Sequence, residues 1–148
     1  MKKLLPPVLF IIFVILMGIV CWGFGFSHLV EYPYNLIGLP FLLGGLLLAQ
    51  ASKKIFLRLK TNVDTFKDPD ILVTTGIFRF TRNPMYLGFV VSLIGAAILY
   101  QGAVSSFILA VIFFVITDRW YIRYEERALL DKFGNEYEMY RTSTRRWV

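Results

Sequence analysis

The sequence predicts an all-α integral membrane protein with about four transmembrane helices, a tight hairpin between the last two and an amphipathic cytoplasmic C-terminal helix. Hydrophobic residues make up 57% of the 148 residues and charged residues 18%, whereas soluble domains carry roughly 45–50% and about 25%. The apolar residues gather in four long stretches. All Lys and Arg residues lie in segments that four alternating helices would place on one side of a membrane.

The first predicted span covers residues 4–26 and contains no charge, and about 20 apolar residues suffice to cross a bilayer. Lys2 and Lys3 precede it, so a secretory signal peptide is the main alternative. The run is longer than the usual apolar region of a signal peptide, about 7–15 residues, and no small-x-small cleavage site follows it. We therefore expect a mature transmembrane helix.

The second predicted span covers residues 36–56. It is uncharged up to Ala51, and Lys53 and Lys54 can then extend their amines to the interface. Pro40 and the pair Gly44–Gly45 predict either a kink or the close approach of a neighbouring helix.

The third and fourth predicted spans cover residues 85–100 and 103–122, and only Gln101–Gly102 separates them. A two-residue polar break between apolar helices indicates a tight hairpin. A single buried helix of this length is the alternative, and Gly102 beside Gln101 argues against it.

The distribution of charge predicts the orientation. With four alternating helices, the N-terminus, residues 52–84 and the tail share one side, which then carries all 16 Lys and Arg residues. The positive-inside rule places both termini in the cytoplasm, in the plasma or inner membrane if the source is prokaryotic. Topology thus explains the net charge of +6, and we expect the bilayer, and no nucleic acid, as partner.

Several functional classes lack sequence support. Cys21 is the single cysteine, so no intramolecular disulfide can form. The sequence contains no HExxH motif, Cys/His cluster, Walker loop or GxGxxG motif. We predict one membrane domain over residues 1–148 and no metal site.

Candidate site residues lie on the predicted cytoplasmic side. Arg82 stands beside Asn83 and Pro84 at the start of the third span, where unpaired backbone N–H groups suit a carboxylate or another anion. Glu125 and Glu126 follow the fourth span at a similar predicted depth; a plain solvated helix face is the alternative for them.

The tail, residues 123–148, shows helical periodicity interrupted at Gly134, which predicts an amphipathic helix that is kinked or restarted there. Its end, residues 141–148, can either cap a site or bind anionic lipid.

Two motifs carry a family resemblance. TGIFRFTRNPMYLG (75–88) and EERALLDKFGNEYEMYRTSTRRWV (125–148), with a hydrophobic hairpin between them, resemble the isoprenylcysteine carboxyl methyltransferase family and the related phospholipid methyltransferases. The resemblance covers about half of the chain. It implies an integral membrane enzyme that transfers a methyl group from S-adenosylmethionine to a lipid or amphiphilic acceptor.

The resemblance also implies roles for individual residues. Glu125 and Arg123 become the catalytic candidates. The cofactor-binding candidates are Arg82, Asn83, Pro84, Tyr86, Glu126 and Tyr137.

Two positions depart from the family pattern. Asn83 stands where histidine is common, and Tyr121 stands where the carboxyl methyltransferases commonly have arginine. The second departure disfavours a carboxylate-bearing prenylcysteine substrate. The acceptor and the oligomeric state stay open, as do two other functions: an NADPH-dependent membrane reductase of the sterol-reductase type, and a non-catalytic scaffold or lipid-binding protein.

Overall fold

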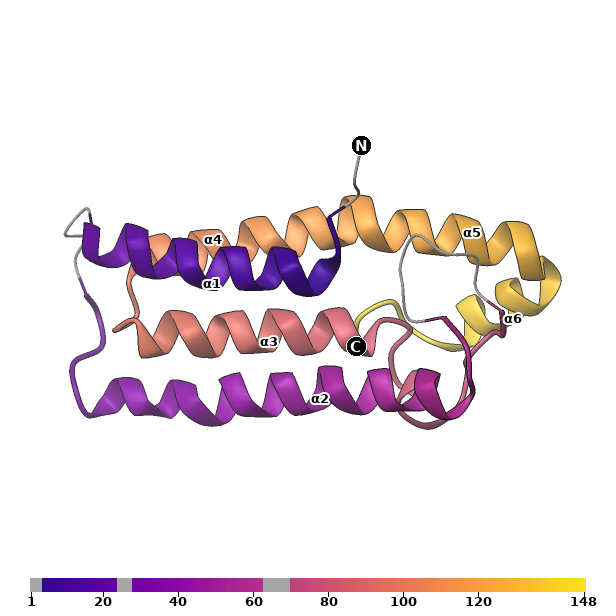
Figure 1. Cartoon of the computed structure of the whole chain (residues 1–148), viewed down its shortest axis with the longest axis horizontal. Coiled ribbons are helices and arrows are strands. Elements are labelled where there is room, and N and C mark those ends of the chain that lie inside the picture. Colours follow the sequence, from indigo (N-terminus) through magenta and orange to yellow (C-terminus); the bar gives the residue numbers. More distant parts are fainter. Residues whose placement is uncertain (1–3, 24–27, 63–69) are drawn as a thin grey trace.

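The computed structural model describes residues 4–23, 28–62 and 70–148, and all regular elements in these ranges are helical. Four long helices run alongside one another: α1 (Pro6–Gly23), α2 (Gly38–Arg58), α3 (Pro84–Leu99) and α4 (Val104–Ile116) (Figure 1). Their bounds lie within a few residues of the four predicted apolar spans. The prediction of an all-α fold is confirmed.

Helix α4 continues without a break into the tail. A π-helical stretch, η3 (Thr117–Ile122), joins it to α5 (Arg123–Phe133). At the junction the buried Thr117 hydroxyl donates to the carbonyls of Phe113 and Phe114, 3.0 and 2.9 Å away. The helix thus extends well past the apolar run, as predicted, whereas its π-helical turn was not predicted.

Among the described residues, three helical stretches are long and apolar enough to cross a membrane: Pro6–Gly23, Tyr34–Arg58 and Val104–Phe133. The second includes the short 3-10 helix η1 (Tyr34–Ile37). Helix α3 is apolar but has only 16 residues, about 24 Å at 1.5 Å per residue. A typical hydrocarbon core is about 30 Å thick. Four spans, and the orientation derived from them, therefore stay predictions.

Helices α2 and α3 are antiparallel and pack backbone against backbone. Gly45 of α2 faces the Gly88 carbonyl and Ser92 of α3, and no room remains there for a Cβ atom. Gly44, one residue earlier, has nothing within 4 Å of such a position. The close approach predicted for the Gly44–Gly45 pair is thus a property of Gly45, and α2 stays one helix beyond Pro40.

The predicted hairpin between α3 and α4 is confirmed. Gln101 and Gly102 both adopt left-handed backbone conformations, with φ of 58° and 66°. The Gly102 amide donates to the Ala97 carbonyl at 3.0 Å, which closes the end of α3.

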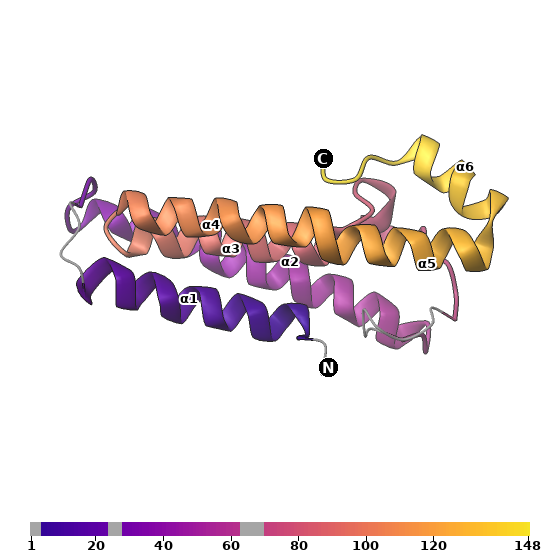
Figure 2. The same ribbon diagram turned by 90° about the horizontal axis from the view of Figure 1, so that it is seen from above.

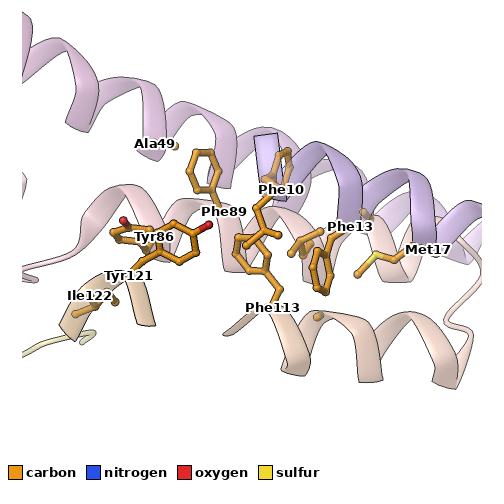
Figure 3. Close-up of a cluster of buried hydrophobic side chains, with 13 residues drawn as sticks. Phe10, Phe13, Met17, Ala49, Tyr86, Phe89, Phe113, Tyr121 and Ile122 are labelled. Carbon is orange, nitrogen blue, oxygen red and sulfur yellow. The ribbon is translucent and has the colours of Figure 1, made fainter. Parts of the chain in front are cut away.

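An aromatic core joins α1 to α3 and α4 (Figure 3). Phe10 stacks on Phe89 with ring centroids 5.1 Å apart, and Phe13 meets Phe113 edge-on at 5.4 Å. The core continues to Tyr86 and Tyr121 near the start of α3. This packing holds α1, α3 and α4 together next to the end of the bundle at which the candidate site lies.

The tail folds back toward the bundle (Figures 1 and 2). Gly134, with φ of 49° and ψ of −120°, separates α5 from α6 (Asn135–Ser143), as the predicted restart requires. The chain then returns to the start of α3, where the Arg82 amide donates to the Arg145 carbonyl at 2.9 Å. We predicted that the end of the tail either caps a site or binds anionic lipid, and its packing against the start of α3 is consistent with capping.

Candidate functional site

A cavity of about 130 Å³ lies at the end of the bundle where α2 ends and α3 begins. Residues from five segments surround it: α2, the chain before and within η2 (Gly76–Arg79), the start of α3, α5 and α6. The lining consists of Phe56, Asn62, Ile71, Leu72, Val73, Phe78, Arg82, Asn83, Pro84, Met85, Tyr86, Glu125, Glu126, Ala128, Leu129, Tyr137 and Tyr140.

The start of α3 places Arg82 at the cavity. Pro84 occupies the first helical turn, where its missing N–H costs no hydrogen bond. The preceding Asn83 is buried, and its side-chain amide donates to the Arg146 carbonyl at 3.0 Å. The Thr81 hydroxyl donates to the same carbonyl at 3.2 Å. This turn is therefore held against the tail on both sides of Arg82.

The Arg82 guanidinium is largely buried, with its side chain 10% exposed. Its Nη1 donates to the carbonyls of Arg141 and Thr144 at 2.8 and 2.7 Å, and its Nη2 donates to Glu126 Oε1 at 2.9 Å. Its Nε is buried and has no hydrogen-bond partner within the described residues. A buried N–H of a charged group calls for an acceptor, and an anionic ligand would provide one.

Glu126 is shared by two arginines. Its Oε1 accepts from Arg82 and, at 3.1 Å, from Arg146 Nε, while its Oε2 accepts from Arg146 Nη2. The hydrogen bond to Glu126 raises the pKa of Arg146, against the opposite effect of burial. Both oxygens of this carboxylate are thus engaged by guanidinium groups.

Glu125 has a different neighbour. The buried Tyr86 hydroxyl donates to Glu125 Oε1 at 2.7 Å, and both side chains line the cavity. Adjacent glutamates on α5 therefore have distinct environments: Glu126 belongs to an arginine cluster, and Glu125 contacts a phenol.

Two tyrosines of α6 close the cavity. Burial is the main cause that raises the pKa of both Tyr137 and Tyr140 to about 12. The Tyr140 hydroxyl donates to the Phe78 carbonyl at 2.6 Å, which ties α6 to η2. Both phenols are protonated at neutral pH and can serve as hydrogen-bond donors.

Seven of the eight residues predicted for the site line this cavity: Arg82, Asn83, Pro84, Tyr86, Glu125, Glu126 and Tyr137. Arg123 is exposed on α5 and is absent from the lining. Its geometry gives no support to a catalytic role. The individual roles of all eight residues stay predictions.

Three residues beside the cavity escaped the sequence-based prediction. Asp118 accepts from Arg146 Nη1 at 3.3 Å and from Trp147 Nε1 at 2.9 Å. The Trp147 ring packs on Phe114, with centroids 4.8 Å apart. The sequence shows that Asp118 directly follows an apolar run and that Trp147 stands beside Arg146 in a polar tail. Neither pattern indicates that Asp118 and Trp147 meet, because they are 29 positions apart.

The lining combines charged and apolar side chains. Arg82, Glu125 and Glu126 provide the charges, whereas Phe56, Leu72 and other apolar side chains form the remainder. Within the described ranges, no group of three His, Cys, Asp or Glu side chains has the geometry to hold a metal ion. The arrangement suits a ligand that carries charges of both signs next to an apolar group.

Comparison with known proteins identifies related sequences. Residues 33–136, well over half of the chain, match the family model described as phospholipid methyltransferase. The chain is 34% identical over 71 residues to a protein-S-isoprenylcysteine O-methyltransferase of Schizosaccharomyces pombe (48% of this chain and 30% of that protein). It is 38% identical over 81 residues to the protein of the same name in Saccharomyces cerevisiae (53% and 33%).

A bacterial relative has a different named activity. The chain is 33% identical over 73 residues to methanethiol S-methyltransferase 1 of Bradyrhizobium diazoefficiens (49% of this chain and 24% of that protein). The matched segments thus span about a third or less of these relatives. No solved structure matches the chain.

Proposed function

The chain belongs to the phospholipid methyltransferase family, and from this premise we propose that it is an S-adenosylmethionine-dependent methyltransferase for a membrane-embedded or amphiphilic acceptor. Arg82 carries the proposal. Its buried Nε lacks a partner among the described residues, at a cavity that also holds two glutamates and two tyrosines of α6. The relatives named as methyltransferases support the reaction class.

The residues of the cavity fit the methyl donor. S-adenosylmethionine carries a carboxylate, an ammonium group, a sulfonium and an adenine ring. Arg82 Nε and the N–H groups of the first turn of α3 are suitable donors to the carboxylate. The aromatic rings of the lining suit the adenine and the sulfonium.

The two glutamates divide the remaining roles. Both oxygens of Glu126 accept from arginines, whereas Glu125 accepts from the Tyr86 hydroxyl at the cavity and is the carboxylate we assign to the reacting groups. Glu126 then acts by holding Arg82.

When bound, the cofactor supplies a methyl group on a positively charged sulfur, which departs as a neutral thioether. The chain positions that methyl group and excludes water, since transfer by in-line displacement depends mainly on alignment. A methyl acceptor that arrives protonated must lose its proton, and Glu125, which accepts from the Tyr86 hydroxyl, is a carboxylate of the cavity lining. We therefore assign proton acceptance to Glu125.

The apolar part of the lining supports an amphiphilic acceptor. Phe56, Leu72, Val73 and Leu129 contribute apolar side chains to the cavity lining. The relatives' names specify acceptors as unlike as an isoprenylcysteine and methanethiol. We accordingly propose only the class, an apolar or lipid-like molecule whose head group reaches Glu125.

We also propose four spans, with α3 crossing beside α2, and cytoplasmic termini. The absence of Lys and Arg from residues 27–35 and 101–102 supports this orientation. In a Cys21→Ala background, the Gln101→Cys variant should react with an impermeant maleimide on intact cells. The Thr142→Cys variant should react only after permeabilisation. The reverse pattern would contradict the orientation.

Calorimetry on detergent-purified or nanodisc-embedded protein tests the cofactor. The wild type should bind S-adenosylhomocysteine, and Arg82→Ala should weaken binding about tenfold or more, because a charge-assisted hydrogen bond is lost. Arg79→Ala, which removes an exposed arginine three residues away, is the matched control and should bind normally. A folded wild type that binds neither S-adenosylhomocysteine nor S-adenosylmethionine would refute the proposal, and binding of NADPH instead would favour a reductase.

A further inference from the structure

We propose that Asp118 and Arg146 are positioning residues for the methyl-donor site, and that they act by fixing Glu126 and, through it, Arg82. This inference rests on the proposed function. Neither residue lines the cavity, so neither is expected to touch the cofactor. They act on the cavity through Glu126, to which Arg146 donates hydrogen bonds.

Arg146 bridges two carboxylates from different parts of one continuous helix. Its Nε and Nη2 hold both oxygens of Glu126, while its Nη1 contacts Asp118 Oδ1 at 3.3 Å. The paired contact with Glu126 restricts the carboxylate to one orientation, since a guanidinium fork fixes direction as well as distance.

That orientation determines where Arg82 points. Glu126 Oε1 accepts from Arg82 Nη2, and two tail carbonyls accept from Nη1. With both terminal nitrogens held, Nε is left as the buried donor of this lining residue that has no partner among the described residues. If Glu126 turned away, the guanidinium would rotate and the alignment of Nε with a ligand carboxylate would be lost.

Asp118 holds the other side of Arg146. Its Oδ1 accepts from both Arg146 and Trp147, and Trp147 is itself packed on Phe114. The three side chains Asp118, Arg146 and Trp147, here called the tail clasp, thus connect the end of the chain to the helix formed by α4, η3 and α5. Asp118 lies in the π-helical stretch η3, from which it accepts hydrogen bonds from the other two members of the clasp.

Affinity for S-adenosylhomocysteine, measured by calorimetry, tests the inference. Arg146→Ala should weaken binding about tenfold, because Glu126 loses its paired partner. Asp118→Asn should weaken binding in the same direction but less, since the amide oxygen still accepts from Trp147. Arg127→Ala, which removes an exposed arginine beside Glu126, is the matched control and should leave binding unchanged.

A double-mutant cycle separates positioning from general stability. If Arg146 acts through Glu126, adding Arg146→Ala to Glu126→Gln should change affinity by less than about twofold. A purely structural role predicts the same loss in both backgrounds. If Arg146→Ala does not fold, Asp118→Asn alone and in the Glu126→Gln background provides the same comparison.

The outcomes are distinguishable from failure of the proposed function. A wild type that does not bind S-adenosylhomocysteine refutes the proposed function and this inference with it. A wild type that binds, with Arg146→Ala within about twofold of it, refutes the inference alone. Equal losses in the two backgrounds refute it as well.

Discussion

Arg82 and Glu126, 44 positions apart, form an ion pair with Nη2 and Oε1 separated by 2.9 Å and side chains 10% and 16% exposed. The pair connects the turn that precedes α3 with α5, and Arg146 of the tail donates to the same Glu126 oxygen. Ion pairs this well covered depend on full hydrogen bonding, because an unpaired buried charge is costly. The cavity is therefore bounded by groups that hold one another in place.

Glu126→Gln should destabilise the fold. Removing the carboxylate leaves two guanidinium groups facing a neutral amide, and we expect a loss of about 1.5–3 kcal/mol in unfolding free energy. Glu138→Gln is the control: its pair with Arg141 is 3.4 Å long and half exposed, and such surface pairs contribute less than about 1 kcal/mol. Thermal unfolding in detergent measures both. Equal effects of the two substitutions would contradict the structural role given to Glu126.

Tyr86→Phe should lower the rate of methyl transfer more than it lowers cofactor affinity. The substitution removes the hydroxyl that donates to Glu125 at 2.7 Å and keeps the buried ring. If Glu125 takes the proton from the methyl acceptor, the orientation of its carboxylate affects kcat, and we expect kcat to fall about tenfold. Steady-state kinetics and calorimetry on the same protein separate the two quantities. An unchanged kcat with weakened cofactor binding would instead assign Tyr86 to the cofactor.

Gly45→Ala should destabilise the α2–α3 pair. A Cβ atom at this position would collide with the Gly88 carbonyl and Ser92, and forcing extra atoms into a packed interface costs about 1–3 kcal/mol. Gly44→Ala is a neighbouring control with open space around it, and it should be neutral or slightly stabilising. Unfolding in detergent compares them. Similar behaviour of the two variants would argue against backbone contact between α2 and α3.

The buried tyrosines predict loss of stability in alkaline solution. The pKa of Tyr137 is raised to about 12, above the unfolded value of about 10. Between these values the unfolded chain releases the proton and the folded chain keeps it, so the stability present below about pH 10 falls as pH rises.

Unfolding midpoints of the wild type and Tyr137→Phe between pH 9 and pH 12 test this prediction. The variant should show a shallower decline, by up to about 1.4 kcal/mol per pH unit. Tyr34→Phe, at an exposed position, should follow the wild type. Parallel curves for wild type and Tyr137→Phe would contradict the assignment.

Local sequence patterns were sufficient to predict most of the fold. Uncharged runs located α1 to α4, and the Gln101–Gly102 break located the hairpin, because helix length and turn chemistry depend on neighbouring residues. The break at Gly134 was visible for the same reason. The number of spans did not follow in this way, since α3 is shorter than a typical bilayer core.

The sequence was sufficient to predict those site residues that lie in recognisable motifs. Arg82 and Glu125 were candidates from their charge and their position beside the predicted spans, and the family resemblance added Tyr137. The fold places all three at one cavity. Asp118 and Arg146 could not be found in the same way, because pairing over 28 positions depends on how the tail folds back. Arg123 illustrates the opposite case: it lies close to the glutamates in sequence but on the exposed face of α5.

A crystal structure determined with saturating S-adenosylhomocysteine would test the central claim most directly. We predict ligand density in the cavity at the start of α3, with the amino-acid carboxylate within about 3.2 Å of Arg82 Nε. The Arg82–Glu126 pair should be retained. Ligand density at another site, or a cavity without ligand in such crystals, would contradict the account.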